Sequence, residues 1–176
     1  MSNRPRFISD VMLGSLAKWL RILGFDTLYF KNIDDNELIR IAKQQNRMLL
    51  TRDTGIARRK RIDNFMLISS EDTFEQLKEI LSVQKKLFLD ADGRLSTENG
   101  GLKLSPRCPE CNGELAVADK GAVAGAVPEY VLLNCNSFFR CNECGKVYWD
   151  GSHRKLMAER IRKVLGEIEW KPSGND

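Results

Sequence analysis

The segment Cys108-Pro-Glu-Cys111 and its later counterpart Cys141-Asn-Glu-Cys144 decide how this chain is organised. Each pair of cysteines is followed by turn residues, Asn112-Gly113 in the first segment and Gly145 in the second. A CxxC pair on a tight turn points two thiolates at one ion, so two such pairs predict a closed tetrahedral site for Zn²⁺. Closed four-cysteine sites are mostly structural. The pattern therefore predicts a module that a zinc ion stabilises. The function has to be inferred from the rest of the chain.

The N-terminal half of the sequence alternates between strand and helix signals. Short β-like runs lie at residues 6–9, 27–30, 48–51 and 65–69. Apolar residues at helical spacing lie at 11–23, 35–46 and 73–86, with a short basic helix or turn at 54–61. Strands that alternate with helices at this spacing predict parallel strands joined by right-handed crossovers. We therefore expect an α/β fold with a small doubly wound parallel sheet.

The C-terminal half predicts a smaller, β-rich unit. Residues 90–105 are rich in turn formers and indicate a linker between a first domain at 1–89 and a second at 106–170. β-like runs at 130–133 and 137–140 suit a zinc ribbon built on hairpins. A C-terminal helix is expected from residue 153 onward, because apolar residues recur there at helical spacing.

Composition and charge narrow the class of protein. The chain has 176 residues, of which 42% are hydrophobic, as in ordinary globular proteins. No apolar run could span a bilayer and no signal-peptide pattern opens the chain, so we expect a cytoplasmic protein without a membrane partner. The five cysteines then indicate metal in a reducing compartment, with Cys135 as a buried or idle thiol. The net charge of +4 comes from residues 1–104, which hold 18 basic and 14 acidic residues and so favour an anionic partner.

Acidic residues follow every predicted strand of the first domain. They are, in order of the strands, Asp10; Asp34, Asp35 and Glu37; Asp53; and Glu71 and Asp72. All lie at the carboxyl edge of the expected sheet, where open parallel sheets bind ligands. Carboxylates gathered at one edge repel one another unless a cation is present, and Mg²⁺ or Mn²⁺ favours such oxygen ligands. The alternative for each single acid is a helix N-cap, which fits Asp72 best because Glu75 stands at capping-box spacing.

Basic residues lie close to these acids in the sequence. Arg58-Arg59-Lys60-Arg61 follows Asp53, and Lys18 and Arg21 lie on the polar side of the first expected helix. They are candidates for contacts with a nucleic-acid backbone, since Lys and Arg attract the polyanion without reading its sequence. The alternative for 58–61 is a solvated surface segment. His153, the only histidine, is expected to be structural or on the surface rather than a general acid or base.

Several segments resemble one known family in the same order along the chain. They are residues 7–24, Asp34-Asp35-Asn36-Glu37-Leu38, Leu49-Leu50-Thr51-Arg52-Asp53, both cysteine pairs, and Val147-Tyr148-Trp149-Asp150-Gly151-Ser152-His153. Together they resemble the Mut-seven C-terminal RNase family, a PIN-like group, over nearly the whole chain. The resemblance implies a PIN-like nuclease domain fused to a zinc ribbon whose zinc is structural.

The resemblance also implies an activity and a site. PIN-type enzymes cut single-stranded RNA with acids that hold Mg²⁺ or Mn²⁺, and the family positions correspond here to Asp10, Asp35 and Asp53. Substitutes for the second acid and candidates for a fourth remain open: Asp34 or Glu37, and Glu71 or Asp72. PIN-like domains often dimerise, so the resemblance is also compatible with a homodimer.

On this reading Arg52 and residues 58–61 would position the RNA backbone, and the ribbon would bind RNA or a protein partner.

One alternative function uses the same fold without catalysis. An RNA or ribosome adaptor would need the basic residues but not the acids. A receiver-like phosphorylation switch also places acids after its first and third strands, but this sequence lacks the acidic pair that follows the first strand in such domains.

Overall fold

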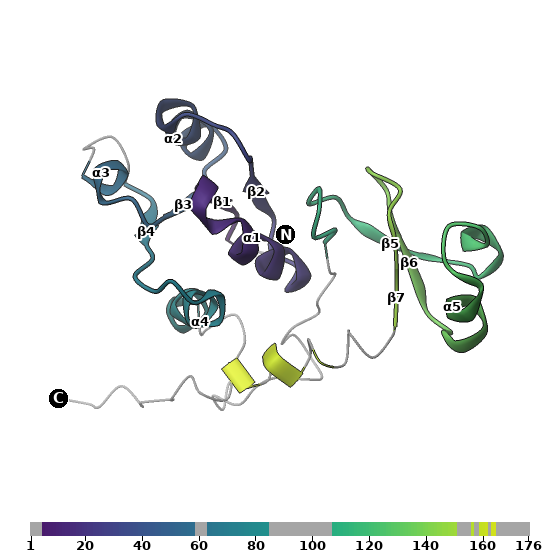
Figure 1. Cartoon of the computed structure of the whole chain (residues 1–176). Coiled ribbons are helices and arrows are strands. Elements are labelled where there is room, and N and C mark those ends of the chain that lie inside the picture. Colours follow the sequence, from purple (N-terminus) through teal and green to yellow (C-terminus); the bar gives the residue numbers. More distant parts are fainter. Residues whose placement is uncertain are drawn as a thin grey trace, which may run out of the picture.

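The protein has two sheets joined into one molecule, as a computed structural model shows (Figure 1). The structure describes residues 5–58, 63–84 and 107–150, together with residues 156, 159–161, 163 and 164. The first sheet belongs to the N-terminal half and is parallel, and the second belongs to the cysteine-containing half and is antiparallel. The predicted α/β fold with a separate β-rich ribbon is therefore confirmed.

The parallel sheet has four strands in the order β2-β1-β3-β4. Their bounds are Phe7–Ser9 for β1, Thr27–Tyr29 for β2, Met48–Thr51 for β3 and Phe65–Leu67 for β4. The chain moves outward from β1 to β2 on one side and from β3 to β4 on the other. The strand order therefore reverses between β1 and β3, and this switch point is where open α/β sheets bind ligands.

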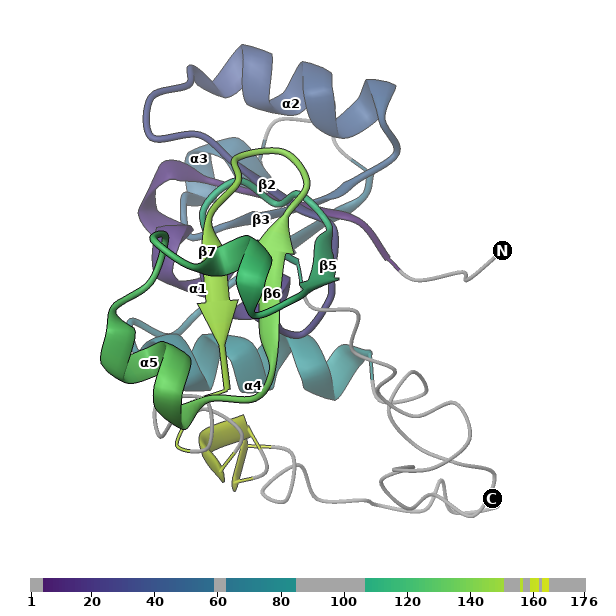
Figure 2. The same cartoon turned by 90° about the vertical axis from the view of Figure 1, so that its right-hand side faces the viewer.

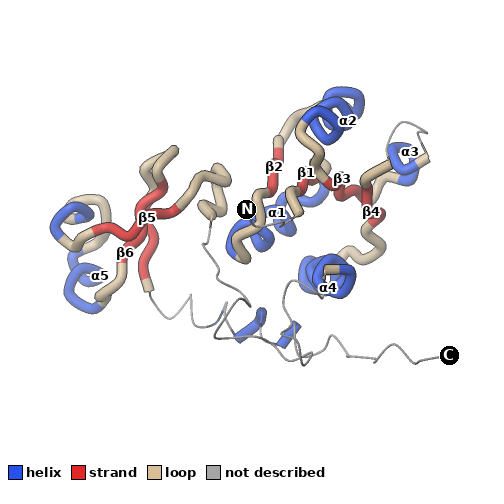
Figure 3. The backbone as a smooth tube through the Cα atoms, turned by 180° about the vertical axis from the view of Figure 1, so that it is seen from behind, coloured by secondary structure: helices blue, strands red, loops and turns tan. Residues whose placement is uncertain are grey.

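Helices cover both faces of this sheet (Figure 3). They are η1 (Val11–Leu13), α1 (Gly14–Ile22), α2 (Asp35–Gln44), α3 (Thr54–Ala57) and α4 (Thr73–Val83). Alternate residues of the strands divide between two cores, since Phe7 and Leu50 pack with α1 and α4 whereas Ile8 and Leu49 pack with α2 and α3. Both cores are apolar, which is why the strands read as nearly continuous hydrophobic runs.

The predicted first helix at 11–23 divides into two pieces. The turn η1 is a 3₁₀-helix whose start is capped by Asp10, and the α-helix begins only at Gly14. The helix ends before Gly24, which has a φ of 81° and so adopts the left-handed conformation that glycine tolerates best.

The ribbon is a three-stranded antiparallel sheet in the order β5-β6-β7, which lies in front of the parallel-sheet domain in Figure 2. Its elements are β5 (Leu115–Ala118), η3 (Gly121–Val123), α5 (Glu129–Asn134), β6 (Phe138–Cys141) and β7 (Val147–Trp149). A small core of Val123, Val127, Val131, Cys135 and Phe138 joins α5 to the sheet.

The predicted strand at 130–133 is wrong, because these residues form part of α5. In the helix Val131 is buried while Tyr130 and Leu133 are 74% and 72% exposed. A four-residue apolar run has no clear period, so it fits a strand and a helical turn equally well. The strand predicted at 137–140 is confirmed as β6.

The residues described after β7 return to the first domain. Residues 156, 159–161, 163 and 164 are helical, and Ile161 and Val164 are buried in the same core as α1 and α4. The Arg160 guanidinium lies 5.5 Å from the centroid of the Phe74 ring on α4. The start of the predicted C-terminal helix at residue 153 and the predicted linker at 90–105 lie outside the described residues. Within the part of the chain that is described, no helix is both long and apolar enough to cross a membrane.

Candidate functional site

Asp10 is a buried carboxylate at the carboxyl end of β1, with only 5% of its surface exposed. Its Oδ1 accepts a hydrogen bond from the backbone N–H of Val11, and its Oδ2 accepts one from the Thr51 hydroxyl at 2.8 Å. Among the described residues, no lysine or arginine forms an ion pair with it. Burying a carboxylate without a compensating cation is costly, so this position fits a bound metal ion.

Thr51 connects Asp10 to Asp53. Its hydroxyl donates to Asp10 and accepts from the backbone N–H of Asp53 at 2.9 Å. Asp53 is exposed and caps α3, because its Oδ1 accepts from the backbone N–H of Gly55 at 2.6 Å. The two acids follow neighbouring strands, because β1 pairs with β3. One buried hydroxyl therefore links the two acids at the switch point of the sheet.

The acids after β2 have different partners. Asp34 caps α2 by accepting from the backbone N–H groups of Asn36 and Glu37 at 3.0 and 3.1 Å. The Glu37 carboxylate binds the Arg40 guanidinium through two hydrogen bonds of 2.6 Å, and this contact lowers the pKa of Glu37. Asp35 is the first residue of α2 and is partly exposed.

The acids after β4 accept hydrogen bonds from an arginine and from backbone N–H groups. Glu71 accepts a hydrogen bond from the Arg52 guanidinium at 2.8 Å. Asp72 caps α4 by accepting from the backbone N–H groups of Phe74 and Glu75, as its spacing predicted. Its own N–H donates to the Ser70 hydroxyl at 3.1 Å. The N-cap alternative therefore describes the contacts of Asp10, Asp34, Asp53 and Asp72 correctly.

The acids are not drawn together as tightly as the cysteines. Within the described ranges, the one group of three or more potential ligands that lie within 4.8 Å of one another is the four cysteines. Asp10 and Asp53 are joined through Thr51, whereas Asp35 lies at the start of α2. In the described part of the chain the three acids therefore do not form a ligand cluster of the kind that the cysteines form.

Ser9, which directly precedes Asp10, is a buried polar residue that the sequence did not single out. Its hydroxyl is fully buried and has no hydrogen-bond partner among the described residues. Buried hydroxyls without a partner are uncommon in native proteins and call for an explanation such as a bound water. A serine directly before the acid in an otherwise apolar strand is the signal that could have identified it.

The four predicted zinc ligands do lie together in the ribbon. The Sγ atoms of Cys108 and Cys144 are 3.7 Å apart, those of Cys111 and Cys141 are 3.4 Å apart, and all four lie within 4.8 Å of one another. Tetrahedral Zn–S bonds of about 2.3 Å place sulfurs roughly 3.8 Å apart. The donor set and its spacing therefore fit a zinc ion.

Tyr148 lies beside this cluster, with its hydroxyl 3.0 Å from the Cys108 Sγ atom. Burial raises the pKa of the Cys108 thiol, but hydrogen bonds from Tyr148 and from the backbone N–H groups of Glu110 and Cys111 outweigh burial and lower it to about 7. The thiolate is the metal-binding form, and burial instead raises the pKa of Cys111, so Cys108 loses its proton more readily than Cys111 does. Gly113 packs so closely against the second cysteine pair that an added Cβ would lie 2.9 Å from the Cys141 Sγ atom.

Comparison with known proteins identifies the family to which this chain belongs. A sequence model of the Mut7-C RNAse domain matches residues 5–161, which span both sheets and all four cysteines. The chain belongs to the Mut7-C RNAse domain family. The resemblance stated from the sequence is thereby confirmed. No curated protein and no solved structure matches the chain.

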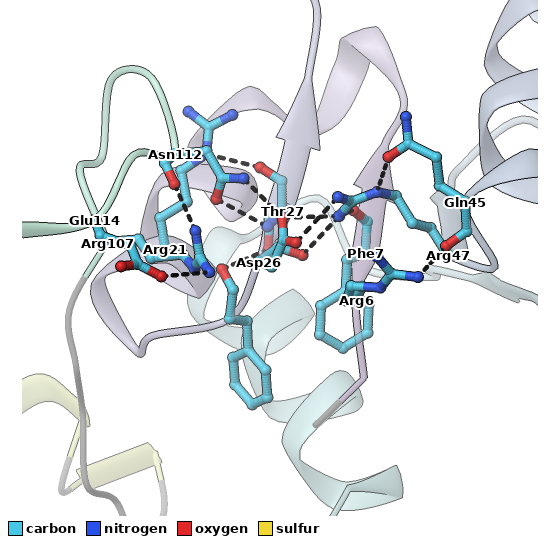
Figure 4. Close-up of polar contacts among 11 residues, drawn as sticks. Arg6, Phe7, Arg21, Asp26, Thr27, Gln45, Arg47, Arg107, Asn112 and Glu114 are labelled. Carbon is cyan, nitrogen blue, oxygen red and sulfur yellow. Dashed lines mark hydrogen bonds and ion pairs between the residues drawn. The ribbon is translucent and has the colours of Figure 1, made fainter. Parts of the chain in front are cut away.

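In this Mut7-C RNAse chain the segment of the first cysteine pair is tied to the parallel sheet, and Figure 4 shows the contacts of Asn112, in the turn after that pair, with Asp26 and Thr27. The Arg21 guanidinium donates to the carbonyl groups of Pro109 and Glu110 at 2.8 and 3.0 Å. The Asn112 side chain accepts from the backbone N–H of Thr27 at 3.0 Å and donates to Asp26 at 2.7 Å.

The contacts continue from Asp26 into the sheet. The Arg47 guanidinium binds both oxygens of Asp26 at 2.8 and 3.0 Å and also donates to the carbonyl of Phe7. Arg47 is only 6% exposed. The polar network therefore runs from the turn of a zinc-binding segment to the central strand β1.

These contacts change the expectations for the basic residues of the Mut7-C RNAse chain. Arg21, expected on a polar surface, is only 4% exposed and is occupied by the carbonyl groups described above. Lys18 pairs with Glu110 at 3.3 Å and Arg52 pairs with Glu71. Arg58 is exposed at the end of α3, and residues 59–61 lie outside the described part of the chain.

Two further predictions concern single residues of the ribbon. Cys135 is 9% exposed and packs against Val131 and Phe138, as expected for a buried thiol. His153 lies outside the described residues.

Proposed function

We propose that the chain is a metal-dependent ribonuclease that hydrolyses phosphodiester bonds of single-stranded RNA at the carboxyl edge of the parallel sheet. One observation carries the proposal. Asp10 is buried at the switch point without a cationic partner among the described residues, and Thr51 links it to Asp53. Membership of the Mut7-C RNAse family supports the same reaction class.

Asp10, Asp35 and Asp53 are the residues proposed to hold Mg²⁺ or Mn²⁺. Bound there, the metal would lower the pKa of a water molecule and neutralise charge that develops on the phosphoryl oxygens. In the hydrolysis the water oxygen bonds to phosphorus while the bond from phosphorus to O3′ breaks. The products carry a 5′-phosphate and a 3′-hydroxyl.

The neighbouring residues have supporting roles in this proposal. Thr51 fixes the Asp10 carboxylate through its hydroxyl and holds the backbone of Asp53. Arg52 and the exposed Arg58 would attract the RNA backbone, together with residues 59–61. The zinc site is proposed to be structural, because four cysteines fill a tetrahedral coordination shell and leave no open position.

The test compares cleavage of labelled single-stranded RNA, with added Mg²⁺ or Mn²⁺, by zinc-loaded wild-type protein and three Asp→Asn variants, D10N, D35N and D53N. Asparagine caps helices as well as aspartate, so Asp53→Asn should retain the capping contact while removing the charge. We expect a loss of at least about 100-fold in rate for each variant, because losing a metal ligand removes several kcal/mol of transition-state stabilisation. Asp63→Asn is the matched control, since Asp63 is exposed and precedes β4 at the opposite edge of the sheet.

The second candidate is an RNA-binding adaptor without catalysis. It is favoured by the observation that Asp34 and Asp53 are engaged as helix caps and that the acids do not form a tight ligand cluster within the described residues. Intact RNA that binds equally to wild type, Asp10→Asn and Asp53→Asn would support the adaptor. Metal-dependent cleavage that disappears in these variants would exclude it.

A further inference from the structure

An exposed apolar patch adjoins Asp10 at the carboxyl edge of the sheet. Val11 and Met12, the two residues after Asp10, are 39% and 61% exposed, and Phe30, directly after β2, is 37% exposed. Single exposed apolar side chains are ordinary on protein surfaces, whereas several that gather beside one buried carboxylate suit a ligand that is itself partly apolar. We define the patch as Val11, Met12 and Phe30.

The register of the sheet places Phe30 beside Asp10. Ser9 pairs with Tyr29 on one side and with Leu50 on the other. One residue further along, Phe30, Asp10 and Thr51 therefore stand level on three neighbouring strands. The hydrogen bond from Thr51 to Asp10 shows that β1 and β3 stay aligned as far as Asp10. Because side chains of one row point to the same face, Phe30 flanks Asp10 on the side opposite Thr51.

Tyr29 fixes the end of β2 against the start of η1. Its hydroxyl donates to the backbone carbonyl of Val11 at 3.2 Å, which ties the end of β2 to η1. Its ring lies against Gly14, where an added Cβ would come within 2.7 Å of the Tyr29 hydroxyl oxygen and 2.8 Å of Cζ. Gly14 thus leaves room for the ring, and the two segments that carry the patch are fixed relative to each other.

The chemistry of the patch fits a nucleotide base rather than a protein partner. A stable protein interface buries well over about 1,000 Å², far more than three neighbouring side chains offer. Single-stranded nucleic acids are held by aromatic side chains that stack on bases and by cations that attract the phosphates. Lys31 is exposed and directly follows Phe30, so a cation and an aromatic residue are neighbours in the sequence at this edge of the sheet.

We propose that the patch binds one unpaired base of the RNA, with Phe30 stacking on the face of that base beside Asp10. This inference rests on the proposed function, because it takes the scissile phosphate to lie at Asp10. Lys31 then contacts the phosphate next to that base. The patch contributes to affinity for single strands and disfavours duplex RNA, whose bases are already stacked on their neighbours.

The test measures binding of a short fluorescent oligouridylate and of an abasic chain of the same length. Ca²⁺ replaces Mg²⁺ and Mn²⁺, and a gel afterwards checks that the RNA is intact. We expect Phe30→Ala to weaken binding of the oligouridylate roughly 5- to 100-fold, the range for loss of one stacked base, and to leave binding of the abasic chain unchanged. Phe30→Trp should retain the binding of wild type. Tyr130→Ala is the matched control, because Tyr130 is 74% exposed on α5 in the ribbon.

Other outcomes separate this inference from the proposed function. Wild-type protein that binds neither chain would overturn both. If wild type binds and cleaves RNA but Phe30→Ala binds the oligouridylate as tightly as wild type, the base site is wrong and the nuclease stands. An equal loss on both chains would also overturn it, because the abasic chain offers nothing to stack on.

Discussion

The Asn112 side chain, in the turn after the first cysteine pair, donates a hydrogen bond from Nδ2 to Asp26 Oδ1 at 2.7 Å. Its Oδ1 accepts from the backbone N–H of Thr27 on the edge strand β2. The second cysteine pair has Gly145 at the corresponding place, and both residues have a φ of 71°. The backbone of the turn thus needs only a residue that tolerates the left-handed conformation. An asparagine in the first turn is explained by its side chain, which joins the ribbon to the sheet.

Replacing Asn112 by glycine should destabilise the protein without disturbing the turn. The variant keeps the left-handed backbone conformation but leaves the N–H of Thr27 without its partner in a buried position. Leaving one buried group unsatisfied costs about 1–3 kcal/mol. The free energy of unfolding of the zinc-loaded proteins in urea measures the effect.

The matched control is Gly145→Asn, which puts the same residue into the second turn. Within the described residues, the atoms nearest to a Cβ added there belong to the Arg140 guanidinium, at 3.8 and 4.0 Å, so the expected cost is only that of asparagine in the left-handed conformation, below about 1 kcal/mol. Equal stability of Asn112→Gly and wild type would show that the contact between the two sheets is energetically neutral.

The contacts between the two halves mark the limit of what the sequence predicts. Periodicity gave β3 with its bounds at Met48 and Thr51 and placed Asp10 and Asp53 on one sheet edge, because both signals are local. The contact between Asn112 and Asp26 joins residues 86 positions apart, and no local pattern encodes such a pairing. The burial of Arg21 was missed for the same reason, since its partners are carbonyl groups of a distant turn.

The sequence predicted where the acids lie relative to the strands, but not which acid is buried or which groups each acid contacts. The sequence indicated which acids follow which strands, and both the capping and the metal-binding interpretations were compatible with that pattern. The Thr51 hydroxyl distinguishes Asp10 from the other acids, because it fixes a carboxylate that is already buried. Such a distinction depends on the depth of each side chain, which spacing along the chain does not specify.

Asp26 should make stability depend on pH in the acid range. Burial raises the pKa of Asp26, but hydrogen bonds from Arg47 and Asn112 outweigh burial and hold the pKa below its ordinary value of 3.8. A carboxyl with a depressed pKa in the folded state contributes stability above its unfolded pKa and loses it as the pH falls through the folded pKa. We therefore expect the stability advantage of wild type over Asp26→Asn to be full above about pH 5 and to shrink below about pH 4.

Urea unfolding of both proteins from about pH 6 down to about pH 3 tests this expectation. Both proteins have the same cysteines, so release of zinc in acid affects both and largely cancels in the difference. A difference in unfolding free energy that stays constant over this range would show that the contacts of Asp26 do not depend on its charge.

Gly14→Ala should destabilise the protein although it replaces a glycine within a helix. Alanine alone would stabilise the start of α1 by about 0.5–1 kcal/mol. The added Cβ, however, would lie 2.7 Å from the Tyr29 hydroxyl oxygen and 3.3 Å from Cε1, so the ring must move. Overpacking of this kind costs about 1–3 kcal/mol.

A double-mutant cycle with Tyr29→Ala separates the two effects of Gly14→Ala. Once the ring is removed, Gly14→Ala should become neutral or stabilising, which unfolding in urea would detect as a coupling free energy. The same cost with and without the ring would mean that the Cβ meets another obstacle.

Arg21 should strengthen zinc binding from outside the ligand set. Its buried guanidinium donates to the carbonyl groups of Pro109 and Glu110 within the first cysteine pair. Burial lowers the pKa of Arg21, and the thiolates of Cys108 and Cys111 oppose that effect, so cation and thiolates stabilise each other. A zinc ion bound by four thiolates keeps two negative charges, which a buried cation compensates. We expect Arg21→Met to weaken zinc affinity about 10- to 100-fold, the usual cost of losing a group that orients metal ligands.

Competition with a coloured zinc chelator measures that affinity, and circular dichroism confirms that the helices remain folded. Lys146→Met is the matched control. Lys146 is also a cation beside the cysteines, but its side chain is 55% exposed and pairs with Glu110 at 3.7 Å. Water screens an exposed charge far more than a buried one, so this variant should bind zinc within about twofold of wild type. Equal losses of zinc affinity in the two variants would mean that the effect comes from net charge and that the burial of Arg21 has no role in metal binding.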